Sequence, residues 1–342
     1  MKGVNLKSLR QIGPVLLILV FFGCAEDIDR FVPDPQIILK GDIDRFFDAA
    51  RDDISQTTTI NIDFPTAVVT PRKTVLIFQP KSLIDAQGNI ATGFVDIQIL
   101  ELLTRGEILL YGIPTHSRTR LLSSGGEFYV TASQNGLPLT LRDGMPVRIL
   151  TDVTGSTPDE RMELFYGELE DNDLIDSTYT WFEADNNPDL WSNVDVTEWV
   201  ALADSQQIIT GFGYESFSDS IDWINFDVFI NIPQNERTDV CVSLPQEYGN
   251  VNTAVFLVFH QRNSVVALSG NAGIKQFCNY YSQYQLIGVP VGEPVTFAVV
   301  SEQGESKYFF ALVETVLTQD YEISIIPEEA PLEIIKEEIN KL

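Results

Sequence analysis

From Thr57 onward, short runs rich in Val, Ile and Phe alternate with turn sequences. In "GFVDIQILEL", Val95, Ile97 and Ile99 share one face of an extended segment, because side chains of a strand alternate between its two faces. Turn signals such as "DAQGN" and "QNGLP" separate the runs, and Asn-Gly favours positive φ. No alternation of strand and helix patterns appears, which argues against a parallel doubly wound sheet. The sequence therefore predicts a mainly β protein with antiparallel sandwiches.

The N-terminus has the three zones of an export signal. Lys2, Lys7 and Arg10 give a positive start without acidic residues, and an apolar run covers residues 12–22. This run is shorter than the ~20 residues that a membrane-spanning helix needs. Pro14 lies inside it, which argues against a buried core helix. We therefore expect residues 1–23 to be a signal peptide.

Cys24 decides what kind of signal this is. Phe21, at position −3, does not suit an ordinary small-x-small cleavage site, whereas Gly23 followed by Cys24 resembles a bacterial lipoprotein signal. That resemblance implies a lipidated Cys24 as the first mature residue. Each buried methylene contributes about 0.8 kcal/mol, so several acyl chains anchor a protein firmly. We therefore expect the protein to be attached to the membrane through this N-terminal lipid.

The residues after Cys24 indicate an address. Ala25 is not the Asp associated with inner-membrane retention, and Glu26, Asp27 and Asp29 resemble the surface-export signal of Bacteroidetes-type lipoproteins. An ordinary acidic tether is the alternative. We expect an outer-membrane protein that faces the cell exterior, with the periplasmic face as the other orientation.

Length and composition suggest two domains. The 342 residues can bury sizeable cores. The C-terminal segment has Pro331 at its start and Leu332, Ile335 and Ile339 at helical spacing. The predicted units are a signal peptide (1–23), a lipidated cysteine with tether and short helix (24–56), a first β-sandwich (57–154), an acidic Trp-rich connection (155–204), a second β-sandwich (205–330) and a C-terminal amphipathic helix (331–342).

The charge excludes some partners. With 49 acidic and 22 basic residues, the formal net charge is −27. Nucleic acids and anionic lipids are bound largely by Lys and Arg, so neither is an expected partner.

Cys241 and Cys278 are the two other cysteines. An exported protein can join them in a disulfide, and two separate buried thiols fit the sequence equally well.

The sequence offers little for catalysis. His116 is predicted in a solvent-facing loop and His260 at a strand end, and no HExxH, CxxC, Gly-x-Ser-x-Gly or Walker A motif occurs. "SSGG" at Ser123–Gly126 is predicted as a turn or β-bulge rather than a nucleophile site. We assign no catalytic residue and no cofactor, and we do not expect an enzyme.

Two binding features remain. Asp171, Asn172, Asp173 and Asp176 are dense in oxygen ligands that suit calcium, but they lack the EF-hand pattern, and a solvated acidic loop is the alternative. Aromatic rings can stack on sugars or bind proteins. The indoles therefore form either a contact platform for a glycan or protein, or internal staples; the candidates are Trp181, Trp191 and Trp199.

Residues 57–136 resemble a module of Bacteroidetes surface lipoproteins and, distantly, ZU5-type β domains. The shared elements are "IFQPKSLIDAQGNIATGFVDIQILEL" and "LYGIPTHSRTRLLSSGGEFYVTASQNG", and residues 223–342 resemble the half that usually follows. The resemblance implies β structure and supplies no catalytic residues.

Together these features predict a lipid-anchored, non-enzymatic protein that binds or scaffolds an envelope protein or glycan. The alternatives are an accessory lipoprotein that binds through its Trp-rich segment and a hydrolase with a carboxylate site.

Overall fold

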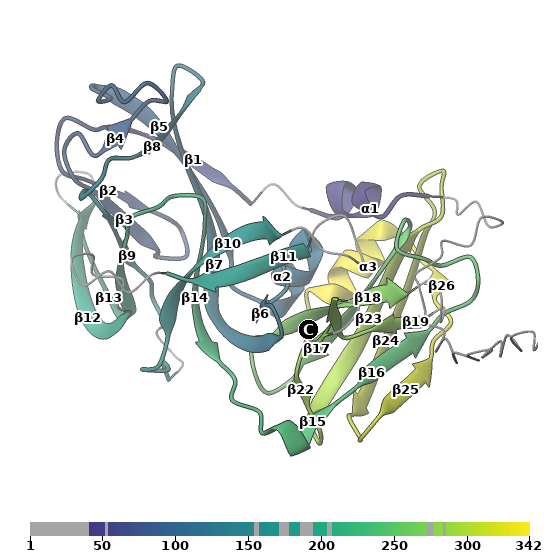
Figure 1. Cartoon of the computed structure of the whole chain (residues 1–342). Coiled ribbons are helices and arrows are strands. Elements are labelled where there is room, and N and C mark those ends of the chain that lie inside the picture. The colour runs from purple at the N-terminus through teal and green to yellow at the C-terminus, as the bar shows by residue number, and fades with distance from the viewer. Residues whose placement is uncertain are drawn as a thin grey trace, which may run out of the picture.

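The computed structural model describes residues 41–51, 54–153, 157–170, 178–184, 194–203, 207–271, 276–282 and 285–342. Most regular structure in these ranges is β-strand, arranged in two units that lie side by side (Figure 1). The predicted mainly β fold is therefore confirmed. No helix within the described ranges is long and apolar enough to cross a membrane.

The first β unit covers residues 56–229 and contains two antiparallel sheets. The strands of the larger sheet run, in spatial order, β1 (Gln56–Asn61), β5 (Phe94–Leu102), β7 (Arg120–Gln134), β14 (Trp223–Phe229), β10 (Glu163–Glu170) and β11 (Thr178–Glu183), with β4 (Leu83–Ile84), β6 (His116–Ser117) and β8 (Leu137–Leu141) beside this path. The smaller sheet has the order β12 (Asp195–Ala203), β13 (Gln207–Ser218), β9 (Val147–Leu150), β3 (Val75–Phe78) and β2 (Thr66–Val69).

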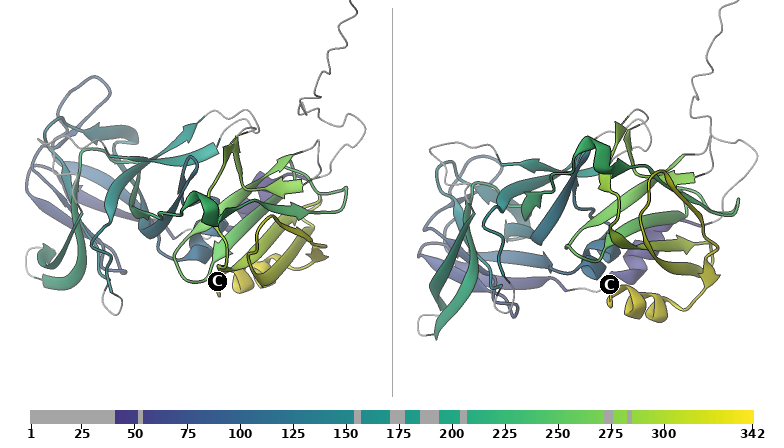
Figure 2. Two further views of the ribbon diagram at one scale, coloured as in Figure 1. Left: turned by 60° about the horizontal axis from the view of Figure 1, so that its bottom comes forward. Right: turned by 90° about the horizontal axis from the view of Figure 1, so that it is seen from below.

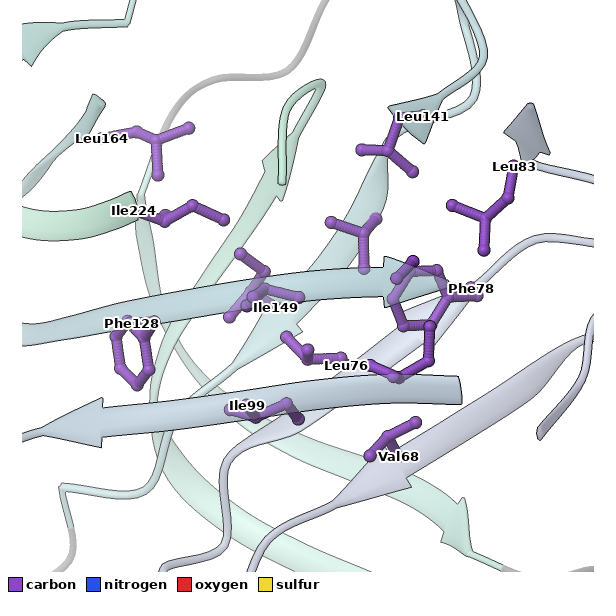
Figure 3. Packing of buried hydrophobic residues seen from close by; sticks show 14 of the residues in the cluster. Val68, Leu76, Phe78, Leu83, Ile99, Phe128, Leu141, Ile149, Leu164 and Ile224 are labelled. Atoms are coloured by element: carbon purple, nitrogen blue, oxygen red, sulfur yellow. The ribbon is translucent and has the colours of Figure 1, made fainter. Parts of the chain in front are cut away.

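The two sheets face each other across one apolar core. The larger sheet contributes Ile99 and Phe128, and the smaller sheet contributes Leu76 and Ile149 (Figure 3). These residues come from alternate positions along their strands, so the period-two pattern in the sequence predicts which side chains enter the core.

The second β unit consists mainly of one eight-stranded sheet. Its order is β25 (Tyr321–Ser324), β16 (Val240–Ser243), β19 (Gln276–Cys278), β18 (Val265–Asn271), β17 (Thr253–Phe259), β23 (Pro294–Glu302), β24 (Tyr308–Val316) and β26 (Glu328–Glu329). Two short ladders and one 3-10 turn complete the unit: β15 (Arg237–Thr238) with β22 (Val289–Pro290), β20 (Tyr280–Ser282) with β21 (Gln285–Leu286), and η1 (Gln234–Glu236).

This sheet is bent around its own core. Val242 of β16, Leu257 of β17 and Phe297 of β23 share one buried cluster although other strands separate β16 from β17. Strands β16 and β25 pair in parallel, whereas the neighbours of β17 are antiparallel. The two halves of this sheet therefore enclose one core as in the predicted sandwich, and they are joined through β18, which pairs with both β17 and β19.

Strand β17 is buried on both faces. Its odd-numbered Val255, Leu257 and Phe259 enter the core cluster, while Phe256 and Val258 pack against helices. A strand covered on both faces has an almost continuous apolar sequence, which explains the run Thr253–Phe259.

Three α-helices gather on the outer face of this sheet (Figure 2): α1 (Ile43–Ala50), α2 (Arg105–Tyr111) and α3 (Leu332–Ile339). Asp42 caps the N-terminus of helix α1, where its side chain accepts a hydrogen bond from the Asp44 amide, and the helix buries Phe46 and Phe47. Helix α3 buries Ile335 and Ile339, as their spacing predicts.

Helix α2 was not predicted, although its signals are in the sequence. Thr104 and Glu107 form a reciprocal capping box, and Gly112 ends the helix in a left-handed conformation. The helix follows β5 of the first unit but packs against β18 and α3. It therefore ties the first unit to the second.

The predicted domain boundaries need correction. Residues 155–204, predicted as a long connection, supply strands β10, β11 and β12 of the first unit. Strands β13 and β14, predicted in the second sandwich, also pair within the first unit. The chain therefore crosses between the β units after Phe229, because the acidic, Trp-rich segment forms hairpins rather than a linker.

Candidate functional site

The two β units meet along the start of β7 and the β6–β7 hairpin. The Thr115 amide donates to the Val265 carbonyl at 2.8 Å, and the Val265 amide donates to the Thr115 hydroxyl at 2.8 Å. The Ser124 amide donates to the Asn263 carbonyl at 2.9 Å. These hydrogen bonds, with α2, join the units directly, and we call this region the junction.

The junction contains a cleft of about 290 Å³. One wall comes from the start of β7, and the other from the segment that follows β14 and from β15. The lining residues are Thr119, Arg120, Leu121, Ile230, Asn231, Ile232, Pro233, Arg237 and Gly288. Clefts between domains are a frequent place for ligand binding.

A buried polar layer lies on the outer face of the larger sheet beside the junction. In the ladder of β7 and β14, Glu127 pairs with Asn225, and Ser124 pairs with Asp227. Two residues of β7, Gly125 and Gly126, stand between these pairs opposite the single Phe226. This bulge confirms the structure predicted for "SSGG".

The bulge explains why the polar groups cluster. In a regular strand, Ser124 and Glu127 would point to opposite faces, because their separation is an odd number of residues. The extra residue brings both to one face, beside Asn225 and Asp227. The Ser124 hydroxyl donates to Asn225 Oδ1 at 2.9 Å and accepts a bond from the Gly126 amide.

Glu127 and Asp227 are completely buried. All four of their carboxyl oxygens lack a hydrogen-bond partner among the described residues. Burial raises the pKa of Asp227 to about 8, and burial together with the nearby Asp227 raises the pKa of Glu127 well above its usual range. At neutral pH we therefore assign both groups mainly to the protonated form, since a buried charge without a partner is costly.

An aromatic layer covers this face of the sheet. Trp181 and Trp223 contact each other edge to face with centroids 6.3 Å apart, and Tyr179 contacts both rings. Trp181 Nε1 donates to the Pro114 carbonyl at 3.0 Å. Burial raises the pKa of Tyr179. The layer closes the acid pair away from solvent, so the pair cannot meet a dissolved substrate in this conformation.

The indoles also fill the space above glycines. Gly167 pairs with Trp181 across β10 and β11, and Gly211 pairs with Trp199 across β13 and β12. A Cβ at Gly211 would overlap the Trp199 ring, and one at Gly167 would lie 2.9 Å from the Trp181 ring. Covering a strand glycine with a cross-strand aromatic ring protects an otherwise open backbone.

Of the two alternatives that the sequence left open for the indoles, the structure supports internal packing for Trp181 and Trp199. Trp181 is fully buried, Trp199 is 2% exposed, and Trp199 Nε1 donates to the Thr151 carbonyl at 2.9 Å. Buried indoles with satisfied N–H groups cannot stack on an outside ligand. Trp191 lies outside the described residues.

The remaining predicted residues are placed as follows. Cys241 and Cys278 form a disulfide between neighbouring strands β16 and β19, which decides between the two alternatives left open by the sequence. Cys24 and the calcium candidates Asp171, Asp173 and Asp176 lie outside the described residues. Within the described ranges no group of three or more His, Cys, Asp and Glu is arranged to hold a metal ion.

His116 is not in a solvent-facing loop as predicted. It is 1% exposed and packs edge to face on Tyr281 of the second unit. Burial lowers its pKa to about 4, so the ring is neutral at physiological pH. The sequence did not show this, because His116 is covered by residues distant in the chain, β11 of the first unit and Tyr281 of the second. His260 is at a strand end, as predicted, with Nε2 2.7 Å from the Thr296 hydroxyl.

A polar network spans the junction at its rim. Glu170 of β10 accepts a hydrogen bond from Arg118 at 3.1 Å and another from the hydroxyl of Tyr281. These bonds connect the β6–β7 hairpin and β10 of the first unit with β20 of the second.

Comparison with known proteins adds no family. Neither a scan against protein-family models nor a search of curated proteins found a match.

Proposed function

We propose that this protein is exported, anchored at the outer membrane by lipid on Cys24, and used there as a non-catalytic binding or scaffolding module. The observation that carries the proposal is the Cys241–Cys278 disulfide. It occurs in a chain whose N-terminal segment contains an apolar run and no acidic residue, and Cys24 directly follows that segment. Structural disulfides persist in oxidising compartments and are rare in the cytosol.

Chain length limits how far the folded part can lie from a lipid on Cys24. The chain between Cys24 and Ile43, where α1 begins, spans at most about 65 Å when fully extended. With a lipid on Cys24, Ile43 would therefore lie within about that distance of the membrane surface.

The architecture supports a scaffolding role. The β units are joined by backbone hydrogen bonds, by α2 and by the Glu170 network, so the relative position of their surfaces is restrained. The cleft at the junction supplies a concave surface, and its lining residues include no carboxylate, histidine or cysteine that could act as a nucleophile or general base.

The anchor has a direct test. Cells that express the wild-type chain should incorporate radiolabelled palmitate into it and retain it in the membrane fraction, and Cys24→Ala should lose both properties. The matched control is the double variant Cys241→Ala/Cys278→Ala, which removes the two disulfide-bonded cysteines and should keep the label. A Cys24→Ala protein that remains labelled and membrane-bound would refute lipid anchoring.

The orientation needs a separate test. We place the protein on the cell exterior because Glu26, Asp27 and Asp29 resemble a surface-export signal. Protease added to intact cells should degrade the protein. Protection in intact cells, with cleavage after permeabilisation, would place it on the periplasmic face.

A further inference from the structure

We propose that the junction cleft binds a small ligand through an oxyanion, a carboxylate or a phosphate, held between Arg120 and Arg237. Both residues line the cleft, Arg120 at the start of β7 and Arg237 in β15. The Gly288 amide donates to the Thr119 carbonyl at 2.9 Å, which fastens the two sides together next to both arginines. This proposed ligand site is separate from the lipid anchor, and the binding test below does not depend on whether Cys24 is lipidated.

Both guanidinium groups retain unused donors. Arg237 Nε donates to the Ile232 carbonyl at 3.0 Å, while its two terminal nitrogens have no hydrogen-bond partner among the described residues. Arg120 lies over the ring of Phe229, and stacking on an aromatic face leaves the edge N–H groups free. Fixing part of each side chain in this way lowers the entropy cost of binding.

Ion pairing separates Arg120 and Arg237 from most arginines of the described chain, a property they share with Arg105 and Arg142. Most arginines of the described chain form ion pairs with carboxylates, for example Arg148 with Glu215 and Arg262 with Glu293. Arg120 and Arg237 are in no ion pair within the described ranges, although the chain has more than twice as many acidic as basic residues. Glu163 lies close enough to Arg120 to feel its charge: burial and the neighbouring Glu183 raise the pKa of Glu163, and Arg120 partly offsets that rise.

The shape of the cleft limits the ligand. At about 290 Å³ it has room for one compact group rather than a long chain. A Cβ at Gly288 would lie 3.2 Å from Arg237 Cδ and Nε, so the absence of a side chain at Gly288 avoids crowding the Arg237 side chain. The remaining wall contains the apolar Leu121, Ile230, Ile232 and Pro233. These features fit an oxyanion attached to a small apolar body, since guanidinium groups bind planar and tetrahedral oxyanions through paired N–H donors.

The test uses the detergent-solubilised full-length protein and calorimetry with three probes: phenyl phosphate, benzoate and the uncharged benzyl alcohol. We expect one anionic probe or both to bind and benzyl alcohol not to bind. The two anions distinguish a phosphate site from a carboxylate site. Binding should weaken as salt is added, because the attraction is screened.

Variants identify the site. Arg120→Gln and Arg237→Gln should each weaken binding by about tenfold or more, the usual effect of losing a charged hydrogen-bond donor. Glu163→Gln should strengthen it, because it removes a competing negative charge. The matched control is Lys307→Gln, an equal charge change in the exposed turn between β23 and β24, which should leave affinity unchanged.

Folding is checked for each variant by its thermal unfolding midpoint. The proposal is overturned if neither anion binds the wild-type protein, if both arginine variants bind as the wild type does, or if Lys307→Gln weakens binding as much as they do. The first two outcomes exclude this cleft as an anion site, and the third shows that only overall charge attracts the probe.

Discussion

Glu127 of β7 and Asp227 of β14 lie on one face of the same sheet, completely buried, and their carboxyl oxygens have no hydrogen-bond partner in the described part of the chain. The bulge at Gly125 and Gly126 puts them there, and the aromatic layer around Trp181 closes them off. The chain has many exposed carboxylates, and it also buries these two acidic side chains. Their burial is energetically acceptable only when they are protonated, because an unpaired buried charge is costly.

The acid pair predicts a pH-dependent stability. Asp227 has an ordinary pKa of 3.8 in the unfolded chain and about 8 in the folded protein. Between these values the unfolded state has lost the proton and the folded state keeps it, so the free energy of unfolding should fall as pH rises from 5 to 8. The slope from one such group approaches about 1.4 kcal/mol per pH unit. Urea denaturation at several pH values measures it.

Variants separate this effect from that of the acidic surface. Asp227→Asn keeps the shape and cannot ionise, so its stability should depend less on pH than that of the wild type. Glu168→Gln removes an exposed carboxylate of the same sheet and should keep the wild-type slope. An unchanged slope in Asp227→Asn would show that Asp227 is not the titrating group.

The disulfide should stabilise the second β unit. Cys241 and Cys278 are 37 residues apart, and closing a loop of this length restricts the unfolded chain by about 3–4 kcal/mol in the chain-entropy account. Cys241→Ala/Cys278→Ala should lower the free energy of unfolding by that amount, measured by denaturation. Cys24→Ala is the control and should unfold as the wild type does. Equal stability of the double variant would show that the bridge contributes nothing.

The pairing of Trp199 with Gly211 predicts a sensitive backbone position. Gly211→Ala would force the indole out of its place and disturb the Trp199 Nε1 bond to Thr151. We expect a loss of about 1–3 kcal/mol, as in other overpacked cores, and a red-shifted Trp fluorescence. Thr210→Ala, at the adjacent exposed position of the same strand, is the control and should change little. A stable Gly211→Ala protein with unchanged fluorescence would contradict the packing.

Trp181 tests whether the aromatic segment is core or contact surface. Trp181→Ala should cost about 3–5 kcal/mol of stability, because it empties a fully buried site and leaves the Pro114 carbonyl without its donor. In the wild type, acrylamide should quench this indole poorly. If Trp181→Ala were as stable as the wild type, and if acrylamide strongly quenched the Trp fluorescence of the wild type, the Trp181 ring would instead be exposed.

Helix α2 tests the link between the β units. Thr104→Ala removes the N-cap bond to the Glu107 amide and should cost about 1 kcal/mol. Glu107 also pairs with Arg72 of the first unit, so Arg72→Gln should cost less, since Arg72 is partly exposed and solvent screens the pair. Hydrogen exchange of α2 amides should rise in Thr104→Ala. Unchanged exchange would show that α2 does not depend on its cap.

Local chemistry made much of this fold predictable. The alternation of Val95, Ile97 and Ile99 requires a strand with one buried face, the continuous run from Thr253 to Phe259 suits a strand covered on both faces, and the spacing of Ile335 and Ile339 suits a helix. Each pattern depends on neighbours along the chain and on the regular geometry of one element. The bulge at Gly125 and Gly126 was predictable for the same reason.

Only the tertiary structure decided the rest. Residues 155–204 look like a linker because their strands carry many polar side chains, and the Trp–Gly pairs that stabilise them form only when two strands meet. His116 is buried where β11 of the first unit and Tyr281 of the second lie against it. Glu127 and Asp227, about a hundred residues apart, meet only through the register of β7 and β14. The sequence alone determines the acidic charge of this chain and its many strand-forming segments. Whether a given residue is buried depends on which residues pack against it, and those contacts form only in the complete fold.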